Sequence, residues 1–367
     1  MTRALLVPRP ARRAAVRRQG ALGSLGLRLI LGLLIVVTVL VSSGTGPVDV
    51  SPSEALRIIV GHLVPNMPWM LDGSITLLQD QAVWQFRLPR VLMALLAGGG
   101  LALAGTLMQA VVRNPLAEPY ILGVSAGAGV GAVLVIVLGS AVVGGLTLQA
   151  AAFGGALVAT TAVYLFARQR GAISPTRLIL AGVALGSLFS AITSYLTITT
   201  DAQNVFSVLF FLLGSVSAVT MNQLAAPAVV LAVVLLLALT QGRSLNALLM
   251  GDEAATSLGV SVQRLRGGLL VATALLTGTI VSVAGGIGFV GLVIPHVCRI
   301  LVGSDHRRML PAAVLAGGLF LALADLLART VAAPTEIPLG ILTALVGAPF
   351  FLWLMRRKRA GRAGLNR

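Results

Sequence analysis

Ionisable residues are scarce in this sequence, and their spacing excludes most enzymatic chemistry. The three histidines, His62, His296 and His306, lie far apart and lack the spacing of metal ligands. The one cysteine, Cys298, lies in an apolar run, so no intramolecular disulfide can form. The single lysine, Lys358, follows an arginine, which excludes a phosphate-binding GxxxxGK(S/T) loop. We therefore expect no catalytic residue, metal site or cofactor in this chain, and any ATP and Mg²⁺ must bind to another chain.

The densest group of unusual residues is RNPLAEP, residues 113–119, which separates two long apolar runs. An Arg or Glu at the centre of a bilayer costs about 2.5–3.5 kcal/mol on insertion scales, and far less at the interface. The two prolines, Pro115 and Pro119, end one helix and begin the next. The pattern predicts an interfacial turn. That turn does not explain the glycines and alanines of GVSAGAGVG (123–131), which favour close helix approach.

The elements that carry these residues must be membrane helices. Hydrophobic residues make up 57% of the 367 residues and charged residues 10%, with a mean hydropathy of +0.97. Soluble domains have about 25% charged residues. The composition therefore predicts an all-α, polytopic membrane protein. The net charge of +16 lies in short inter-helix segments and at both ends, so we expect no nucleic-acid partner.

Ten apolar segments are long enough, or nearly so, to cross a bilayer core of about 30 Å. They are 27–43, 88–111, 119–139, 146–167, 177–198, 224–241, 267–285, 287–302, 311–330 and 338–355. We expect ten transmembrane helices over 27–356, a disordered basic tail over 1–26 and a second basic tail over 357–367. A cytoplasmic N-terminus then places the C-terminus and most of the basic groups on the cytoplasmic side. These groups are Arg3–Arg18, Arg113, Arg168–Arg177, Arg243–Arg266, Arg307–Arg308 and Arg356–Arg359.

Two further patterns concern the organisation of the chain. The first apolar run resembles a secretory signal, but no A-x-A site follows, which favours a retained helix. Beyond it, a capping box at Ser51 and Glu54, with Pro52 between, predicts a short external helix over 52–64. We expect its apolar face to carry the residues Leu56, Ile59, Val60 and Leu63.

The arginine pairs that open RLPRVLMALLAGG (87–99) and RLRGGLLVATALL (264–276) suggest a duplication. Each stretch opens an apolar span and is followed by a span that a proline breaks, at Pro115 or Pro295. Five spans in each half would make the two halves inverted repeats, an arrangement that is common in transporters.

Five stretches resemble, in order, the permeases of the FecCD type. They are FRLPRVLMALLAGGGLALAGTLMQAVVRNPLAEPYILGVSAGAGVG, Leu180–Leu188, LNALLMGDEAATSLGV, GGIGFVGLVIPHVCR and PTEIPLGILTALVGAPFFLWL. The resemblance runs from about residue 85 to the C-terminus. Such permeases are the membrane subunits of ABC importers for iron–siderophores, haem and cobalamin, and iron–siderophore uptake is the commonest of these functions.

The resemblance implies that residues 27–356 form a transmembrane permease domain in the bacterial cytoplasmic membrane. It also implies a second permease subunit (as a homodimer or heterodimer), two cytoplasmic ABC ATPase subunits and an external substrate-binding protein as partners. The substrate would pass between the two permease subunits by alternating access. On this basis we expect an iron–siderophore or a related metal chelate as the substrate.

The same resemblance assigns a cytoplasmic gate to two turns. Asn114 and Leu116 would line the constriction from the first turn, and Pro175 and Thr176 from the second. Proline at 175 departs from the hydroxyl residues that are common there, which leaves the gating contact open. The alternative is a helix start, with Ser174 as N-cap and Pro175 at the first position.

The cytoplasmic loop 244–266 would couple the permease to its ATPase. Its sequence predicts two short helices, Leu245–Met250 and Glu253–Leu258, with Asp252 as the N-cap of the second and Gly259 at its end. The residues that the resemblance assigns to coupling are Leu248, Leu249, Met250, Gly251, Asp252 and Glu253. Three consecutive exposed apolar residues fit a groove on a partner; the alternative is a loop packed on itself.

Three arginines, Arg87, Arg90 and Arg329, fall on the external side, against the positive-inside trend. By resemblance they would pair with acidic residues of the binding protein. The alternatives are snorkelling at the interface and an internal pair, of Arg329 with Asp325 or Glu336.

The main competing function is an ion-coupled secondary transporter, which also fits inverted halves. Ion coupling needs ionisable residues deep within the spans, and Asp325 is the one acid well inside a predicted span. That class also leaves the 244–266 loop without a role. A membrane enzyme would need an assembled catalytic set, which the sequence lacks.

Overall fold

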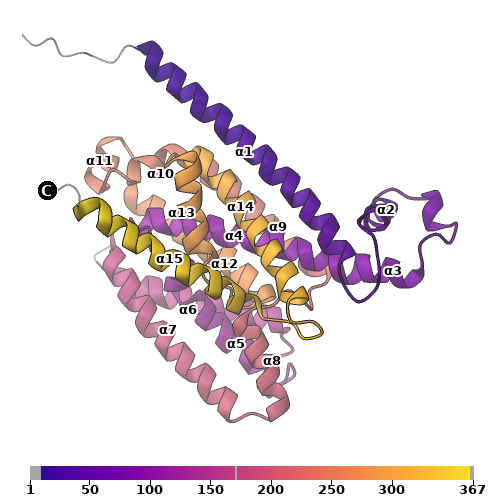
Figure 1. The fold of residues 1–367 in the computed structure, drawn as a ribbon. Coiled ribbons are helices and arrows are strands. Elements are labelled where there is room, and N and C mark those ends of the chain that lie inside the picture. Colours follow the sequence, from indigo (N-terminus) through magenta and orange to yellow (C-terminus); the bar gives the residue numbers. More distant parts are fainter. Residues whose placement is uncertain (1–9, 170–171, 364–367) are drawn as a thin grey trace, which may run out of the picture.

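The computed structural model describes residues 10–169 and 172–363, which form a bundle of α-helices (Figure 1). The longer helices are α1 (Pro10–Gly44), α4 (Leu88–Val112), α6 (Leu148–Ala167), α7 (Pro175–Ile198), α9 (Ala225–Thr240), α12 (Val262–Ala284), α14 (His306–Thr330) and α15 (Leu339–Ala363). The shorter helices are α2 (Pro52–Leu63), α3 (Leu77–Gln81), α5 (Val124–Leu138), α8 (Ala202–Leu213), α10 (Gly242–Leu248), α11 (Asp252–Ser257) and α13 (Val290–Val302).

Single helical turns and one small hairpin complete the described structure. The turns are η1 (Pro68–Met70), η2 (Ala82–Arg87), η3 (Pro119–Leu122) and η4 (Met221–Gln223). The strands β1 (Arg168–Gln169) and β2 (Ala172–Ile173) pair antiparallel, with Arg168 opposite Ile173. The hairpin connects α6 to α7.

Each of the ten predicted segments coincides with one helix, which confirms a polytopic helical membrane protein. Within the described residues, 7 helices are long and apolar enough to cross a membrane by length and composition. Helix α5 is shorter because η3 and Gly123 occupy residues 119–123, and α13 is shorter because residues 285–289 are not helical. The count of ten spans therefore stays a prediction. The apolar helix α8 was not among the predicted segments.

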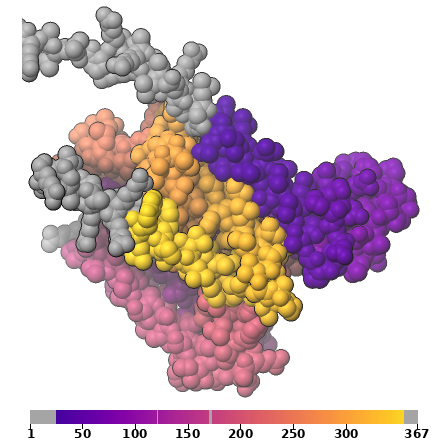
Figure 2. Space-filling model, in the orientation of Figure 1, coloured from indigo at the N-terminus to yellow at the C-terminus, as the bar shows by residue number. Residues whose placement is uncertain are grey.

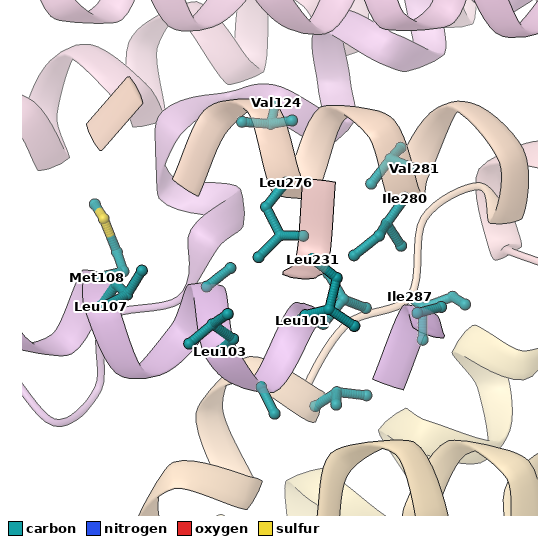
Figure 3. Packing of buried hydrophobic residues seen from close by; sticks show 14 of the residues in the cluster. Leu101, Leu103, Leu107, Met108, Val124, Leu231, Leu276, Ile280, Val281 and Ile287 are labelled. Atoms are coloured by element: carbon teal, nitrogen blue, oxygen red, sulfur yellow. The ribbon is translucent and has the colours of Figure 1, made fainter. Parts of the chain in front are cut away.

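Helix α4 lies at the centre of the bundle, and nearly all of its side chains are buried. It packs against α12, α13 and α14. Figure 3 shows Leu101 of α4 beside Leu276 and Ile280 of α12. A Cβ atom at Gly105 would overlap the backbone carbonyl of Gly291 on α13, so this contact requires glycine. Small residues thus set the close packing of the helices around α4.

The two ends of the bundle differ. Figure 1 shows α10 and α11 at the end where α1 begins and where α15 finishes, whereas α2 and α3 form a lobe at the opposite end. In Figure 2 this lobe projects beyond the helices. Placing both ends of the described chain on one side agrees with an even number of spans. We call the end with α10 and α11 the coupling end.

Both basic tails are partly helical. Helix α1 begins at Pro10, so residues 10–26 are helical, whereas we expected a disordered tail there. Helix α15 continues to Ala363 and includes part of the second tail. Residues 1–9 and 364–367 lie outside the described residues.

The predicted external helix is present as α2, with the expected capping box. The Glu54 amide donates to Ser51 Oγ at 3.2 Å, and the Ser51 amide donates to Glu54 Oε2 at 2.7 Å. The expected apolar face is wrong in part, because Ala55 and Ile58 are buried while Leu56 is exposed. Those two residues are buried because α2 folds back onto α1 and η2.

Candidate functional site

Helices α10 and α11 form a small platform at the coupling end. Leu248 is fully buried between Ala255 of α11 and Val262 of α12, so the expectation that it is exposed is wrong. Leu249 and Met250 are exposed, at 44% and 72% of their surface. Burial of Leu248 fixes the first helix against α12, and this packing presents the next two side chains outward. The platform therefore carries an exposed apolar tip.

Asp252 does not cap α11 as predicted. Gly251 occupies the N-cap position, with φ +109°, and Asp252 is the first helical residue. The Asp252 carboxylate instead accepts hydrogen bonds from Arg266 Nη1 and Nη2 at 2.8 and 2.9 Å. A second guanidinium, that of Arg113, lies 3.4 Å away. A bidentate pair with a buried arginine is stronger than a side-chain cap, which explains the difference.

Arg113 connects the platform to the first predicted gate turn. It ends α4 in a left-handed conformation, with φ +54°. Directly after it, the Leu116 amide donates to Asn114 Oδ1 at 3.0 Å, which closes an Asx turn. Leu116 is exposed beyond that turn. The platform, through Asp252, and the turn with Asn114 and Leu116 are thus joined by one ion pair.

The second predicted gate turn lies at the start of α7. Pro175 is the first residue of the helix, and Thr176 is exposed. Ser174 precedes the helix in an extended conformation, but its hydroxyl donates or accepts no capping bond. Within the described residues, no hydrogen bond or ion pair joins this turn to Asn114. The turn at Asn114 and the turn at Pro175 are thus not in direct polar contact within one subunit.

The sequence analysis missed a partly buried anchor formed by Glu118 and Tyr120. The Phe289 amide donates to Glu118 Oε1 at 2.6 Å. The Tyr120 hydroxyl donates to the Ile287 carbonyl and accepts from the Ile287 amide, both at 2.7 Å. Burial raises the pKa of the Glu118 carboxyl, and the bond from Phe289 opposes that rise. These contacts join the chain before α5 to the chain before α13.

At the opposite end, Arg87 is buried and holds the end of α1. Its guanidinium donates to the carbonyls of Ser43 at 3.2 Å, Gly44 at 2.9 Å and Val48 at 2.6 Å. The Ser43 and Gly44 carbonyls lie in the last turn of α1, where no further helical amide can donate to them, and Val48 follows the helix. Arg87 is therefore turned inward, and not toward a partner as we expected.

Arg90 and Arg329 belong to a buried ionic network on α4 and α14. Arg90 lies 2.9 Å from the Asp325 carboxylate and 2.6 Å from that of Glu336. Arg329 lies 3.9 Å from Asp325 and donates to the Ser42 carbonyl at 2.7 Å. The internal pairing that the sequence left as an alternative is thus present. Docking through these guanidinium groups would require breaking it, so we no longer place them on a docking surface.

The network also bears on the competing transporter class. Asp325, the acid inside a predicted span, has Arg90 as a close partner. A carboxylate held in this way is poorly placed to take up and release a coupling ion. Within the described residues, no group of three or more His, Cys, Asp or Glu side chains could hold a metal ion.

Comparison with known proteins identifies the family to which this helical membrane protein belongs. The FecCD transport family model matches residues 33–357. The cobalamin import system permease protein BtuC of Halobacterium salinarum is 39% identical over 352 residues, which cover 89% of this chain and 94% of the relative. The hemin transport system permease protein HmuU of Yersinia pestis is 38% identical over 340 residues, covering 92% and 98%.

A solved structure extends the likeness to three dimensions. It is the inward-facing conformation of a protein assigned as a metal-chelate type ABC transporter, with a TM-score of 0.77 and 34% sequence identity. The match covers 90% of this chain and 99% of that one. Permease subunits of this kind are not enzymes themselves. The chain therefore belongs to the FecCD transport family, as a multi-pass membrane permease of an ABC importer.

Proposed function

We propose that two permease subunits, each a copy of this chain or of a close sister, enclose a path for a metal chelate across the bacterial cytoplasmic membrane. ATP bound with Mg²⁺ on two partner ATPases would drive alternating access. The observation that carries this proposal is the platform at the coupling end, whose exposed Leu249 and Met250 fit a groove on another protein.

The geometry supports a route from the ATPase to the gate. A movement of the platform would be transmitted through Asp252 to Arg113, and from there to the Asx turn of Asn114. The pair of Asp252 with the buried Arg266 links the same movement to α12. Pro175 and Thr176 would complete the constriction from α7, together with the equivalent residues of the second subunit.

The lobe of α2 and α3 is the surface that we propose for the external binding protein. It lies at the end opposite to the platform and projects beyond the bundle (Figure 2). Arg87, Arg90 and Arg329 would then support this surface from beneath, through α1 and α14, and would not contact the partner.

We further propose that the transported substrate is an iron–siderophore. A corrinoid is the second candidate, because the relative from Halobacterium salinarum is named for cobalamin import. Haem is the third, because the relative from Yersinia pestis is named for hemin transport. All three are bulky metal chelates, which fits a path with apolar walls.

Uptake by a deletion strain tests both levels of the proposal. Cells without this gene should lose uptake of one radiolabelled chelate among a ferric siderophore, haemin and cyanocobalamin, and should regain it with the intact gene. Loss of the siderophore alone supports our first choice, and loss of another chelate replaces it. Unchanged uptake of all three would contradict the proposed chelate import.

A further inference from the structure

A cavity of about 800 Å³ opens between α9, α10 and α12 near the coupling end. Its depth is apolar, with walls that include Leu107, Val234 and Leu269. Its mouth is polar and includes Arg243 and Arg264. No acidic side chain lines it. The cavity is thus basic at one end and apolar at the other.

The two arginines at the mouth differ from the other arginines described above. Arg113 and Arg266 of the same end share the Asp252 carboxylate. By contrast, Arg243 and Arg264 form no hydrogen bond or ion pair within the part of the chain that the structure describes. Both are exposed, so their charges are open to a ligand. The hydroxyls of Ser244 and Ser261 also lie at this mouth.

The cavity lies beside the apolar outer surface of the bundle. Leu237 lines it and is 57% exposed. Leu236 of α9 and Val271 of α12, on the two helices that form its walls, are also exposed. A surface of this kind faces acyl chains when the helices span a membrane. The mouth then lies at the level of the lipid headgroups, since α9 and α12 meet the α10–α11 platform there.

We propose that this cavity binds an anionic phospholipid. The lipid phosphate would lie between Arg243 and Arg264, and one acyl chain would enter the apolar depth toward Leu269. Basic pockets between transmembrane helices bind acidic lipid headgroups in this way. A water-soluble anion would use the arginines but leave the apolar depth empty. The proposal rests on the membrane-spanning arrangement and goes beyond the transport function.

The experiment measures lipid binding to the full-length chain by native mass spectrometry. Phosphatidylglycerol and phosphatidylcholine are compared on the wild type and on the double variant Arg243→Gln/Arg264→Gln. One basic residue changes lipid affinity by about fivefold, so the double variant should bind phosphatidylglycerol about 25-fold more weakly. The matched control, Arg168→Gln/Arg177→Gln, removes two exposed arginines at another turn and should keep wild-type affinity.

A second variant tests the apolar part of the cavity without changing charge. Ala272→Phe should fill the depth and weaken phosphatidylglycerol binding at least tenfold, while the elution volume stays that of the wild type. Equal retention of the two lipids, or unchanged binding in both variants, would overturn the proposal. So would displacement of the lipid by 10-fold excess inorganic phosphate. Loss of ATPase co-purification with unchanged lipid binding would assign the cavity to the ATPase instead.

Discussion

Replacing Asp252 with asparagine should loosen the platform without unfolding the bundle. The Asp252 carboxylate accepts hydrogen bonds from Arg266 Nη1 and Nη2, at 2.8 and 2.9 Å, and lies 3.4 Å from Arg113. Asparagine has nearly the same shape but no charge. Its amide nitrogen is a hydrogen-bond donor and would face a guanidinium nitrogen, which is also a donor. The Arg266 side chain is 2% exposed, so water could hardly reach its guanidinium to replace the lost carboxylate.

The size of the effect follows from this burial. Breaking a fully buried pair costs about 3–5 kcal/mol, and a hydrogen bond to a charged group contributes about 1.5–3 kcal/mol. The Asp252 side chain is 40% exposed, so water can reach the substituted group. We therefore expect a local cost of about 2–3 kcal/mol, which corresponds to a population change of about 30- to 150-fold.

Hydrogen–deuterium exchange measures this local opening. Amides of residues 245–258 should exchange about 30- to 150-fold faster in the Asp252→Asn variant, while those of α4 and α12 stay protected. Uptake should fall in the same variant even though the ATPase still co-purifies. The control Glu253→Gln changes an exposed neighbouring carboxylate and should leave exchange unchanged.

A double variant separates charge pairing from other causes. Asp252→Asn with Arg266→Met removes the stranded charge, so exchange should return toward the wild-type rate. Exchange within twofold of the wild type in the single variant would refute the reasoning. So would a double variant that is as open as the single one.

Three further outcomes follow from the described contacts. Asp325→Asn removes the close partner of buried Arg90 and should lower the free energy of unfolding in detergent by about 3 kcal/mol. The control Asp201→Asn changes an exposed carboxylate and should leave the free energy of unfolding unchanged. Equal stability of the two variants would contradict the prediction. Gly105→Leu should abolish folded material because its side chain meets the α13 backbone, and Gly154→Leu, with open space, should fold. The purified chain should hydrolyse no ATP without a partner, and sustained turnover would refute that expectation.

Hydropathy alone predicted the helices that cross the bundle, because burial in lipid requires long apolar runs. It missed α8, whose 12 residues are too short for a span. It also missed the non-helical chain at Phe289, whose backbone amide donates across the fold to the Glu118 side chain. Such partners lie far apart in the sequence, so no local sequence pattern predicts their contact.

The candidate sites show the same limit. Sequence patterns correctly predicted an exposed apolar tip at Leu249 and Met250. They predicted Asp252 as the N-cap because it directly precedes the predicted helix. In the structure its carboxylate instead pairs with Arg266, 14 residues later. Arg90 and its partner Asp325 are 235 residues apart, so their pairing became visible only once α4 and α14 were placed together.

Co-purification of the partner ATPase tests the central claim most directly. Leu249→Arg and Met250→Arg each place a charge on the exposed tip of the platform, where burial in an ATPase groove would leave it unpaired. Val142→Arg, at a site on the opposite end that is 72% exposed, as Met250 is, serves as the control. We predict normal membrane insertion for all three, with loss of the ATPase and of uptake only in the two platform variants. Retention of the ATPase at the wild-type ratio by both would contradict the coupling role of residues 245–260.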